Sequence, residues 1–358
     1  MPDAIWIDQN AELAALGQTL AAQTWIGVDT EFLRERTFFP KLCLLQLAAD
    51  GQIWCVDTLR GGNLEALVPP LTAASTRKVI HSARQDLEAF YLTTKGVISP
   101  VFDTQIAAGC IGLKPQVGYA ELVKTLLDVT LTKGQTRTDW SKRPLTQAQL
   151  DYAADDVLYL GEIAERLAHR LTELGREHWV LEDCAALEDP LLYEPDPALA
   201  WMKLRGLAQL SPQPRARAKV IAVWREKTAR ERDLPRSWII PDADIFSLAH
   251  ANPATLEDSV AKGLREALRS HSDSEQSDSE DESDQEPSQD ARPTPQQKIV
   301  LERLAKIVDK RAAALQVSAE ILAPRAELKA LAMGRRESHA LSGWRRAEIG
   351  ESLLAAIN

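Results

Sequence analysis

The sequence predicts an α/β domain, built on a mixed sheet of about five strands flanked by helices, followed by all-α helical bundles. Three observations support this prediction. Strand-like stretches open the chain and then alternate with helical ones. Beyond the prolines at 190, 195 and 197, strand patterns almost vanish and helical spacing takes over. The length of 358 residues exceeds what one hydrophobic core usually supports, so several domains are expected.

The expected sheet begins with three antiparallel strands at 25–32, 41–50 and 52–57. The pair Asp50-Gly51 is typical of the tight turn that joins two such strands. The elements expected next are a helix near 63–74, a short strand at 77–82, a helix through 87–92, a short extended segment at 101–103 and three helices up to about residue 174.

The composition divides the chain into five segments. They are an α/β domain at 1–175, a connecting segment at 176–204, a helical bundle at 205–272, an acidic linker at 273–295 and a second helical bundle at 296–358. Nine Asp and Glu residues, with no Lys or Arg among them, lie between His271 and Asp290. Such a stretch cannot offset its ordering entropy by burial, so it is predicted to be disordered.

The net charge of −10 argues against a general nucleic-acid coat and against a polybasic membrane anchor. The charge is unevenly distributed, however. Residues 1–194 carry −10, 195–270 carry +4, 271–290 carry −9 and 291–358 carry +5. The two rear modules are therefore expected to bind phosphate groups through Arg and Lys.

Cysteine spacing and hydropathy exclude further classes. Cys43, Cys55, Cys110 and Cys184 form no CxxC pair, which argues against a zinc knuckle or a redox dithiol and indicates buried small hydrophobic residues. The chain has no apolar window long enough for a membrane span and no basic start before an apolar run. We therefore expect a cytoplasmic protein with no membrane association.

The first chemical candidate is Asp29-Thr30-Glu31, at the end of the opening strand. Residues two apart on a strand point to the same face, so Asp29 and Glu31 would project side by side. Their charges would repel each other near an apolar core, and a divalent cation would relieve that repulsion. The alternative is a solvated strand end.

Two further segments carry candidate residues. Asp86 follows the short strand that ends near His81 and falls in the first turn of a helix, where an acid can also serve only to complement the helix dipole. Tyr152 and Asp156 lie four residues apart on an expected helix and so share one face. A single Tyr-x-x-x-Asp pair is common by chance.

Taken in chain order, these pieces form a recognisable set. The stretches VDTEFLRERTFFPKLCLLQLA, VIHSARQDL and LDYAADDVLYL resemble the three motifs of the DEDDy branch of the DEDD 3′→5′ exonucleases, and within it the ribonuclease D family. The resemblance covers about residues 3–175 and implies a ribonuclease H-like fold. Residues 195–272 resemble an HRDC domain, in VIAVWREKTARERDLPRSWIIPDADIFSLA and NPATLEDSVAKGL. The final module resembles a second, more divergent HRDC domain.

The resemblance implies a mechanism and roles for these residues. It implies hydrolysis of RNA from the 3′ end to nucleoside 5′-monophosphates with two divalent ions, Mg²⁺ expected and Mn²⁺ the alternative, in the 3′ processing of precursor transfer RNA. We expect the chain to act as a monomer. Asp29 would bridge both ions, Glu31 and Asp156 would complete the first site, and Asp86 would serve the second. Tyr152 would hold the attacking water, because a phenol with a pKa near 10 is a poor base at neutral pH.

Residues near these motifs are candidate substrate contacts. Phe32, Arg34 and His81 could contact the terminal nucleotides, and Phe38 and Phe39 extend a basic and aromatic cluster past the strand that suits single-stranded RNA. The alternatives are core packing for the Phe residues and a capping or core role for His81.

Other readings of the same residues stay open. Asp57 and Asp103 repeat the Asp-Thr pattern without a following Glu, and we expect both to be structural caps. Because the four carboxylates are common to related enzymes, a DNA 3′→5′ exonuclease of repair type is an alternative. A catalytically inactive nucleic-acid-binding adaptor is another, against which the five intact catalytic positions argue.

Overall fold

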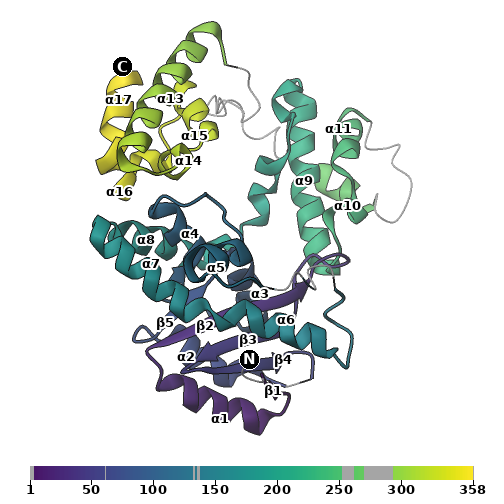
Figure 1. Cartoon of the computed structure of the whole chain (residues 1–358). Helices are drawn as coiled ribbons and strands as arrows, with labels where there is room; N and C mark the ends of the chain where they lie inside the picture. The colour runs from purple at the N-terminus through teal and green to yellow at the C-terminus, as the bar shows by residue number, and fades with distance from the viewer. Residues whose placement is uncertain are drawn as a thin grey trace. The chain divides into compact units, whose positions relative to one another are not determined.

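The computed structural model describes residues 4–60, 62–131, 134, 138–251, 262–269 and 293–357 (Figure 1). Contacts within the chain divide it into two compact units. Unit 1 comprises Met1–Leu33, Pro40–Tyr193 and Pro295–Asn358, and unit 2 comprises Arg34–Phe39 and Glu194–Thr294. The predicted linker at 273–295 falls almost entirely outside the described residues, as does the NPATLEDSV part of the first bundle.

A mixed six-stranded sheet in the order β1-β4-β3-β2-β5-β6 is the framework of unit 1. Its strands are β1 Ile5–Ile7, β2 Trp25–Leu33, β3 Lys41–Ala49, β4 Gln52–Asp57, β5 Arg77–Ile80 and β6 Val101–Asp103. Strands β2, β3 and β4 pair antiparallel, whereas β1, β5 and β6 join in parallel. The predicted mixed sheet is confirmed. The sixth strand was missed because the three residues of β1 are too few to show an alternating pattern.

Helices cover both faces of this sheet. They are α1 Asn10–Ala21, α2 Val68–Thr72, α3 Arg84–Thr94, α4 Thr104–Cys110, α5 Tyr119–Leu127, α6 Gln147–Leu158, α7 Leu160–Leu174 and α8 Glu177–Ala185. Figure 1 shows α6 and α7 lying across the strands. Gly27 of β2 faces Leu160 of α7, whereas Thr30 bonds to α3 on the opposite face. The alternation of β2 therefore sends Asp29 and Glu31 toward the α6 and α7 side.

The C-terminal helices belong to unit 1, although the sequence interpretation set residues 296–358 apart as a module. They are α13 Pro295–Leu315, α14 Ala319–Leu322, α15 Arg325–Ala332, α16 Gly343–Arg345 and α17 Glu351–Ile357. The Trp344 ring stacks on Trp179 of α8 with centroids 4.0 Å apart and planes 11° from parallel. Arg345 binds both carboxylate oxygens of Asp183 at 2.5 and 2.8 Å. These helices share one hydrophobic core with the sheet.

Unit 2 is helical. It contains α9 Pro212–Arg232, α10 Arg236–Ile239, α11 Asp242–His250 and a helical segment at 262–269 around their own hydrophobic core. The segment Arg34–Phe39 packs here, since the Phe38 ring is buried against the Arg236 guanidinium, 4.4 Å from its centroid, and the Asp233 carboxylate accepts from the backbone N–H groups of Phe38 and Phe39. The core alternative therefore holds for Phe38.

Two predictions about the whole chain can be compared with the described residues. All four cysteines are free and buried, as their spacing predicted. Among the described helices, none combines the length and the apolar character needed to span a bilayer.

Candidate active site

The three carboxylates that the sequence singled out on β2 and α6 converge. Asp29, Glu31 and Asp156 each present an oxygen, and these oxygens all lie within 4.8 Å of one another. Asp29 and Glu31 share a face of β2, and a β-bulge follows directly between Glu31 and Phe32. Asp156 comes from α6, which contacts β2, β3 and β4. The strand and the helix therefore bring three carboxyl groups close together.

Helix α6 is held in place by its first turn. Thr146 caps the helix, and Thr146 and Gln149 form a reciprocal capping box. Since this fixes where the helix starts, the four-residue spacing sets Tyr152 and Asp156 one above the other on the face toward the sheet. The phenol of Tyr152 donates a hydrogen bond to the Asp156 carboxylate.

Asp86 lies beside this group. It is buried in the first turn of α3, and the Thr30 hydroxyl donates to one of its oxygens at 2.5 Å. It is not among the three converging carboxylates, but its charge raises the pKa of both Asp29 and Glu31. The structure therefore brings all four predicted carboxylates into one electrostatic site.

A cavity of about 210 Å³ opens over these groups. The residues that line it are Asp29, Thr30, Glu31, His81, Tyr119, Tyr152 and Asp156. No Lys or Arg is among these described lining residues, so no side-chain cation of the wall balances the carboxylates.

The pKa values of the four carboxyl groups are raised, as expected for buried acids without a balancing cation. Burial, followed by the charges of the other three carboxylates, raises the pKa of Asp29 well above its ordinary value. Burial and then the charges of Asp156 and Asp86 raise the pKa of Glu31 to about 8. Burial raises the pKa of Asp86 and of Asp156 to about 7, against the lowering effect of their bonds to Thr30 and Tyr152. All-oxygen donors that are buried and mutually repelling suit a hard divalent cation.

Tyr152 is positioned as a hydrogen-bond donor. Burial, followed by the charges of Asp156, Glu31 and Asp29, raises its pKa far above the ordinary value of a phenol. Its ring packs beside Trp140, with centroids 6.1 Å apart. A phenol held neutral in this way can orient an oxygen ligand but cannot act as a base near neutral pH.

His81 and Tyr119 form another part of the cavity wall. The His81 Nε2–H donates to the Val117 carbonyl at 3.0 Å, since a carbonyl only accepts, and Nδ1 lies 2.9 Å from the Thr104 hydroxyl. Burial lowers the pKa of His81, so the ring stays neutral. These two hydrogen bonds give His81 a structural role, while the residue also lines the cavity. Tyr119, 5.5 Å from His81 between ring centroids, was missed because no spacing in the sequence marks it.

The remaining predicted residues lie elsewhere. Phe32 packs on the core of unit 1, and Arg34 is exposed in the segment assigned to unit 2. Asp103 caps α4 by accepting from the backbone of Gln105 and Ile106, as predicted. Asp57 is also structural: it accepts from the backbone N–H of Leu59 at 3.0 Å, and both of its oxygens bind the buried Arg143 at 2.7 and 2.8 Å.

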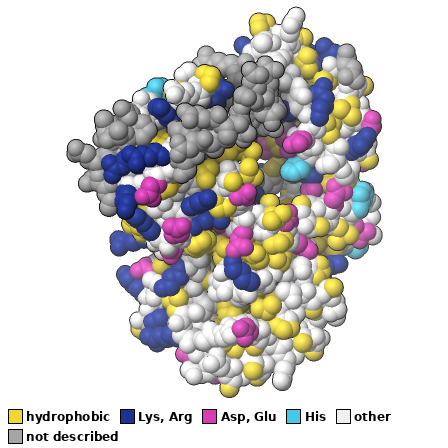
Figure 2. Space-filling model, turned by 180° about the vertical axis from the view of Figure 1, so that it is seen from behind, with side chains coloured by type: hydrophobic (Ala, Val, Ile, Leu, Met, Phe, Trp, Pro, Cys, Tyr) yellow, Lys and Arg dark blue, Asp and Glu magenta, His cyan; other side chains and the backbone are white. Residues whose placement is uncertain are grey.

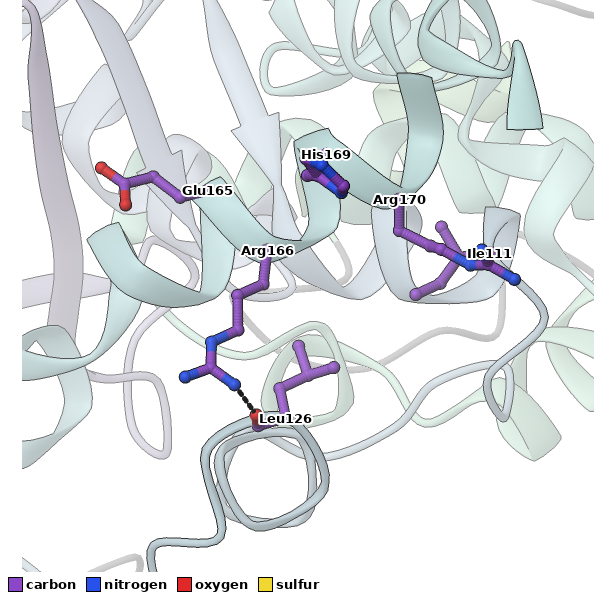
Figure 3. A pocket seen from close by; sticks show the side chains of 6 residues that line it. All are labelled: Ile111, Leu126, Glu165, Arg166, His169 and Arg170. Carbon is purple, nitrogen blue, oxygen red and sulfur yellow. Dashed lines mark hydrogen bonds between the residues drawn. The ribbon is translucent and has the colours of Figure 1, made fainter. Parts of the chain in front are cut away.

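A larger cavity of about 560 Å³ lies by α5 and α7 (Figure 3). Its lining residues are Ile111, Leu126, Glu165, Arg166, His169 and Arg170. Arg166 already binds the Leu126 carbonyl and Glu162, and Arg170 binds Glu173. On the face shown in Figure 2, basic and acidic side chains of the described residues are also interspersed. We therefore assign the candidate active site to the smaller cavity, which carboxylates line.

The sheet, the carboxylates of β2 and α3 and the Tyr-x-x-x-Asp pair of α6 define the class of 3′→5′ exonucleases. In agreement with this, residues 4–172 match the family model described as 3′-5′ exonuclease, and residues 215–261 match that of the HRDC domain. The chain is 38% identical to ribonuclease D of Xanthomonas oryzae pv. oryzae, covering 98% of each chain, and 34% identical to that of Granulibacter bethesdensis, covering 100% of this chain and 93% of the relative.

The chain belongs to the ribonuclease D family and is a 3′→5′ exoribonuclease. The resemblance drawn from the three motifs is thereby confirmed. Among solved structures, its fold is similar to that of Escherichia coli RNase D, described as an exoribonuclease involved in structured RNA processing, with a TM-score of 0.86, 27% identity and coverage of 99% of this chain and 98% of that one.

Proposed function

We propose that the chain is a metal-dependent exoribonuclease that releases nucleoside 5′-monophosphates and trims the 3′ ends of precursor transfer RNA. One observation carries the metal dependence: three carboxylates from two elements converge within 4.8 Å in a cavity that has no Lys or Arg among its described lining residues. The role of the E. coli relative in processing structured RNA supports a structured substrate such as precursor transfer RNA.

The residues divide into two sets of ligands. Glu31 and Asp156 would hold one divalent ion together with Asp29, and Asp86 would hold a second with Asp29. Asp29 suits the shared position because the charges of all three other carboxylates act on it. Mg²⁺ is the expected ion and Mn²⁺ the alternative, since both accept oxygen donors. When bound, such ions acidify a water and stabilise the leaving 3′ oxygen.

Digestion of a 5′-labelled precursor transfer RNA tests this proposal. With Mg²⁺ we expect a ladder that shortens from the 3′ end and nucleoside 5′-monophosphates as products; with EDTA we expect neither. A single-stranded RNA and a DNA of the same sequence serve as matched substrates. Equal rates on RNA and DNA would favour the repair-type alternative, and unchanged cleavage in EDTA would refute the metal dependence.

Stability should depend jointly on pH and metal. Folded carboxyl groups with raised pKa values bind protons more tightly than unfolded ones, whose pKa is about 4. Their contribution to stability is therefore complete below about pH 4 and is lost as pH rises through about 7 to 8 in the metal-free protein. Saturating Mg²⁺ should raise the melting temperature by about 5 °C or more at pH 8 and by little at pH 5.

Thermal unfolding at the two pH values, with Mg²⁺ and with EDTA, measures this effect. NaCl at equal ionic strength separates binding of Mg²⁺ at the site from general screening by added salt. A Mg²⁺-induced shift of the same size at pH 5 and pH 8 would contradict the linkage to these carboxylates.

Replacing Tyr152 by phenylalanine should lower kcat about 10- to 100-fold, because it removes one hydrogen bond to a charged group. The loss is limited to that bond, since the packing of the ring on Trp140 remains. Single-turnover rates on RNA between pH 6 and pH 9 check this expectation. The pH profile of the variant should keep the shape of the parent profile, since the phenol is neutral throughout. Complete loss of activity would instead indicate an acid–base role for Tyr152.

A further inference from the structure

Gln46 has an unusual environment for a polar side chain. It lies in β3 with no exposed surface, and among the described residues neither its Nε2 nor its Oε1 has a hydrogen-bond partner. An unpaired buried polar group costs about 1–3 kcal/mol, and native proteins keep few of them. We therefore expect the Gln46 amide to have a hydrogen-bond partner in another state of the site.

The strand register shows which groups surround Gln46. Its direct partners are Asp29 across the β2–β3 ladder and Cys55 across the β3–β4 ladder. Directly paired residues of antiparallel strands project to the same face, with Cβ atoms about 4.5–5.5 Å apart. The amide of Gln46 therefore shares a face with the Asp29 carboxylate and is near enough to reach it.

The strand register places the other polar residues of β2 and β4 on this face behind Asp29. Asp57 lies diagonally across β4, but Arg143 already binds both of its oxygens. Glu31 lies diagonally across β2, two pairs further along the ladder than Asp29, and the other diagonal residue there is Gly27. Cys55 is a poor hydrogen-bond acceptor. Asp29 is the group that the register offers most directly.

We propose that Gln46 is a positioning residue for the metal site, whose amide N–H donates to the Asp29 carboxylate when that carboxylate is ionised and holds a divalent ion. An ionised carboxylate is an acceptor only, so it can take the amide proton and a cation on different lone pairs. Such supporting hydrogen bonds orient a ligating carboxylate and typically change metal affinity 10- to 100-fold. The inference rests on the metal dependence proposed above.

The full-length Gln46→Met variant tests this role, because methionine keeps the length and shape of glutamine without its amide. Leu47→Met is the matched control: it places the same side chain on the same strand, but Leu47 pairs with Val28 and faces the opposite side of the sheet. Calorimetric titration with Mn²⁺ should show a dissociation constant about 10- to 100-fold higher for Gln46→Met and unchanged for Leu47→Met.

Two further measurements separate positioning from structure. With EDTA, Gln46→Met should melt no lower than the parent, because an unpaired buried amide has been removed. At saturating Mn²⁺, its kcat on RNA should return to the parent value, because no ligand has been lost. A second variant, Gln46→Leu, should behave in the same way.

Three results would contradict one or other of the proposals. Equal Mn²⁺ affinity of Gln46→Met and the parent would overturn the positioning role. So would failure of both Gln46 variants to fold in EDTA, since the amide would then be structural. If the parent chain itself binds no Mn²⁺, the proposed metal dependence fails, which is a separate outcome from either of these.

Discussion

Replacement of Asp29 by asparagine should lower the rate of 3′-end hydrolysis of RNA at least about a thousandfold while the protein stays folded. Asparagine keeps the shape of the side chain but removes the charge on which Glu31, Asp86 and Asp156 all act. A site that lacks its central carboxylate would lose affinity for both divalent ions at once. In EDTA at pH 8 the variant should melt higher than the parent, because one of four repelling buried charges is gone.

Single-turnover digestion at saturating Mg²⁺ measures this effect, with Asp151→Asn as the control. Asp151 lies one turn before Asp155 on the same helix as Asp156, is exposed, and accepts a hydrogen bond from Gln147 at 2.8 Å. Removal of its charge should change the rate less than about twofold, since exposed charges contribute little. An Asp29→Asn rate above a tenth of the parent rate would be incompatible with Asp29 as the shared ligand.

The candidate carboxylates were accessible to sequence analysis because two short periodicities place them. A spacing of two on a strand sets Asp29 and Glu31 on one face, and a spacing of four on a helix sets Tyr152 and Asp156 on another. Local spacing does not show that these two faces meet. The order of the three motifs, through the family resemblance, indicated that they form one site. The structure adds the reason, because α6 crosses β2, β3 and β4.

Residues whose roles depend on register were not predictable. Gln46 is significant only because it pairs with Asp29, and that pairing depends on the connection at 34–40 between β2 and β3 and on the bulge after Glu31. A shift of one residue would send the amide to the opposite face. Tyr119 reaches the cavity from the start of α5, a position that follows from the path of the chain between α4 and α5.

The partner of the C-terminal helices was unpredictable for a related reason. Helical periodicity shows that a segment such as 295–315 has an apolar face, but not which surface covers that face. Charge suggested a basic module that binds phosphate, yet Arg345 is bound to Asp183 of α8 within unit 1. Contacts between residues 162 positions apart in sequence leave no local pattern.

Replacement of Trp344 by alanine should therefore lower the free energy of unfolding of unit 1 by about 3–5 kcal/mol, the usual cost of truncating a buried tryptophan. The ring is only 3% exposed, stacks on Trp179 at 4.0 Å, and donates through Nε1 to Asp183 at 3.0 Å. The variant loses the stack, leaves a cavity beside α8 and removes one donor from a carboxylate that Arg345 still binds.

Equilibrium denaturation of the full chain, followed by hydrogen exchange of β2 and β3, measures the loss. Trp238→Ala is the matched control, because Trp238 is 59% exposed in unit 2 and its truncation should cost less than about 0.5 kcal/mol. Since the C-terminal helices share a hydrophobic core with the sheet, faster exchange should reach the strands that carry Asp29 and Gln46. Unchanged exchange in β2 and β3 would show that the C-terminal helices unfold separately from the catalytic sheet, and the stack would then stabilise only its own surroundings.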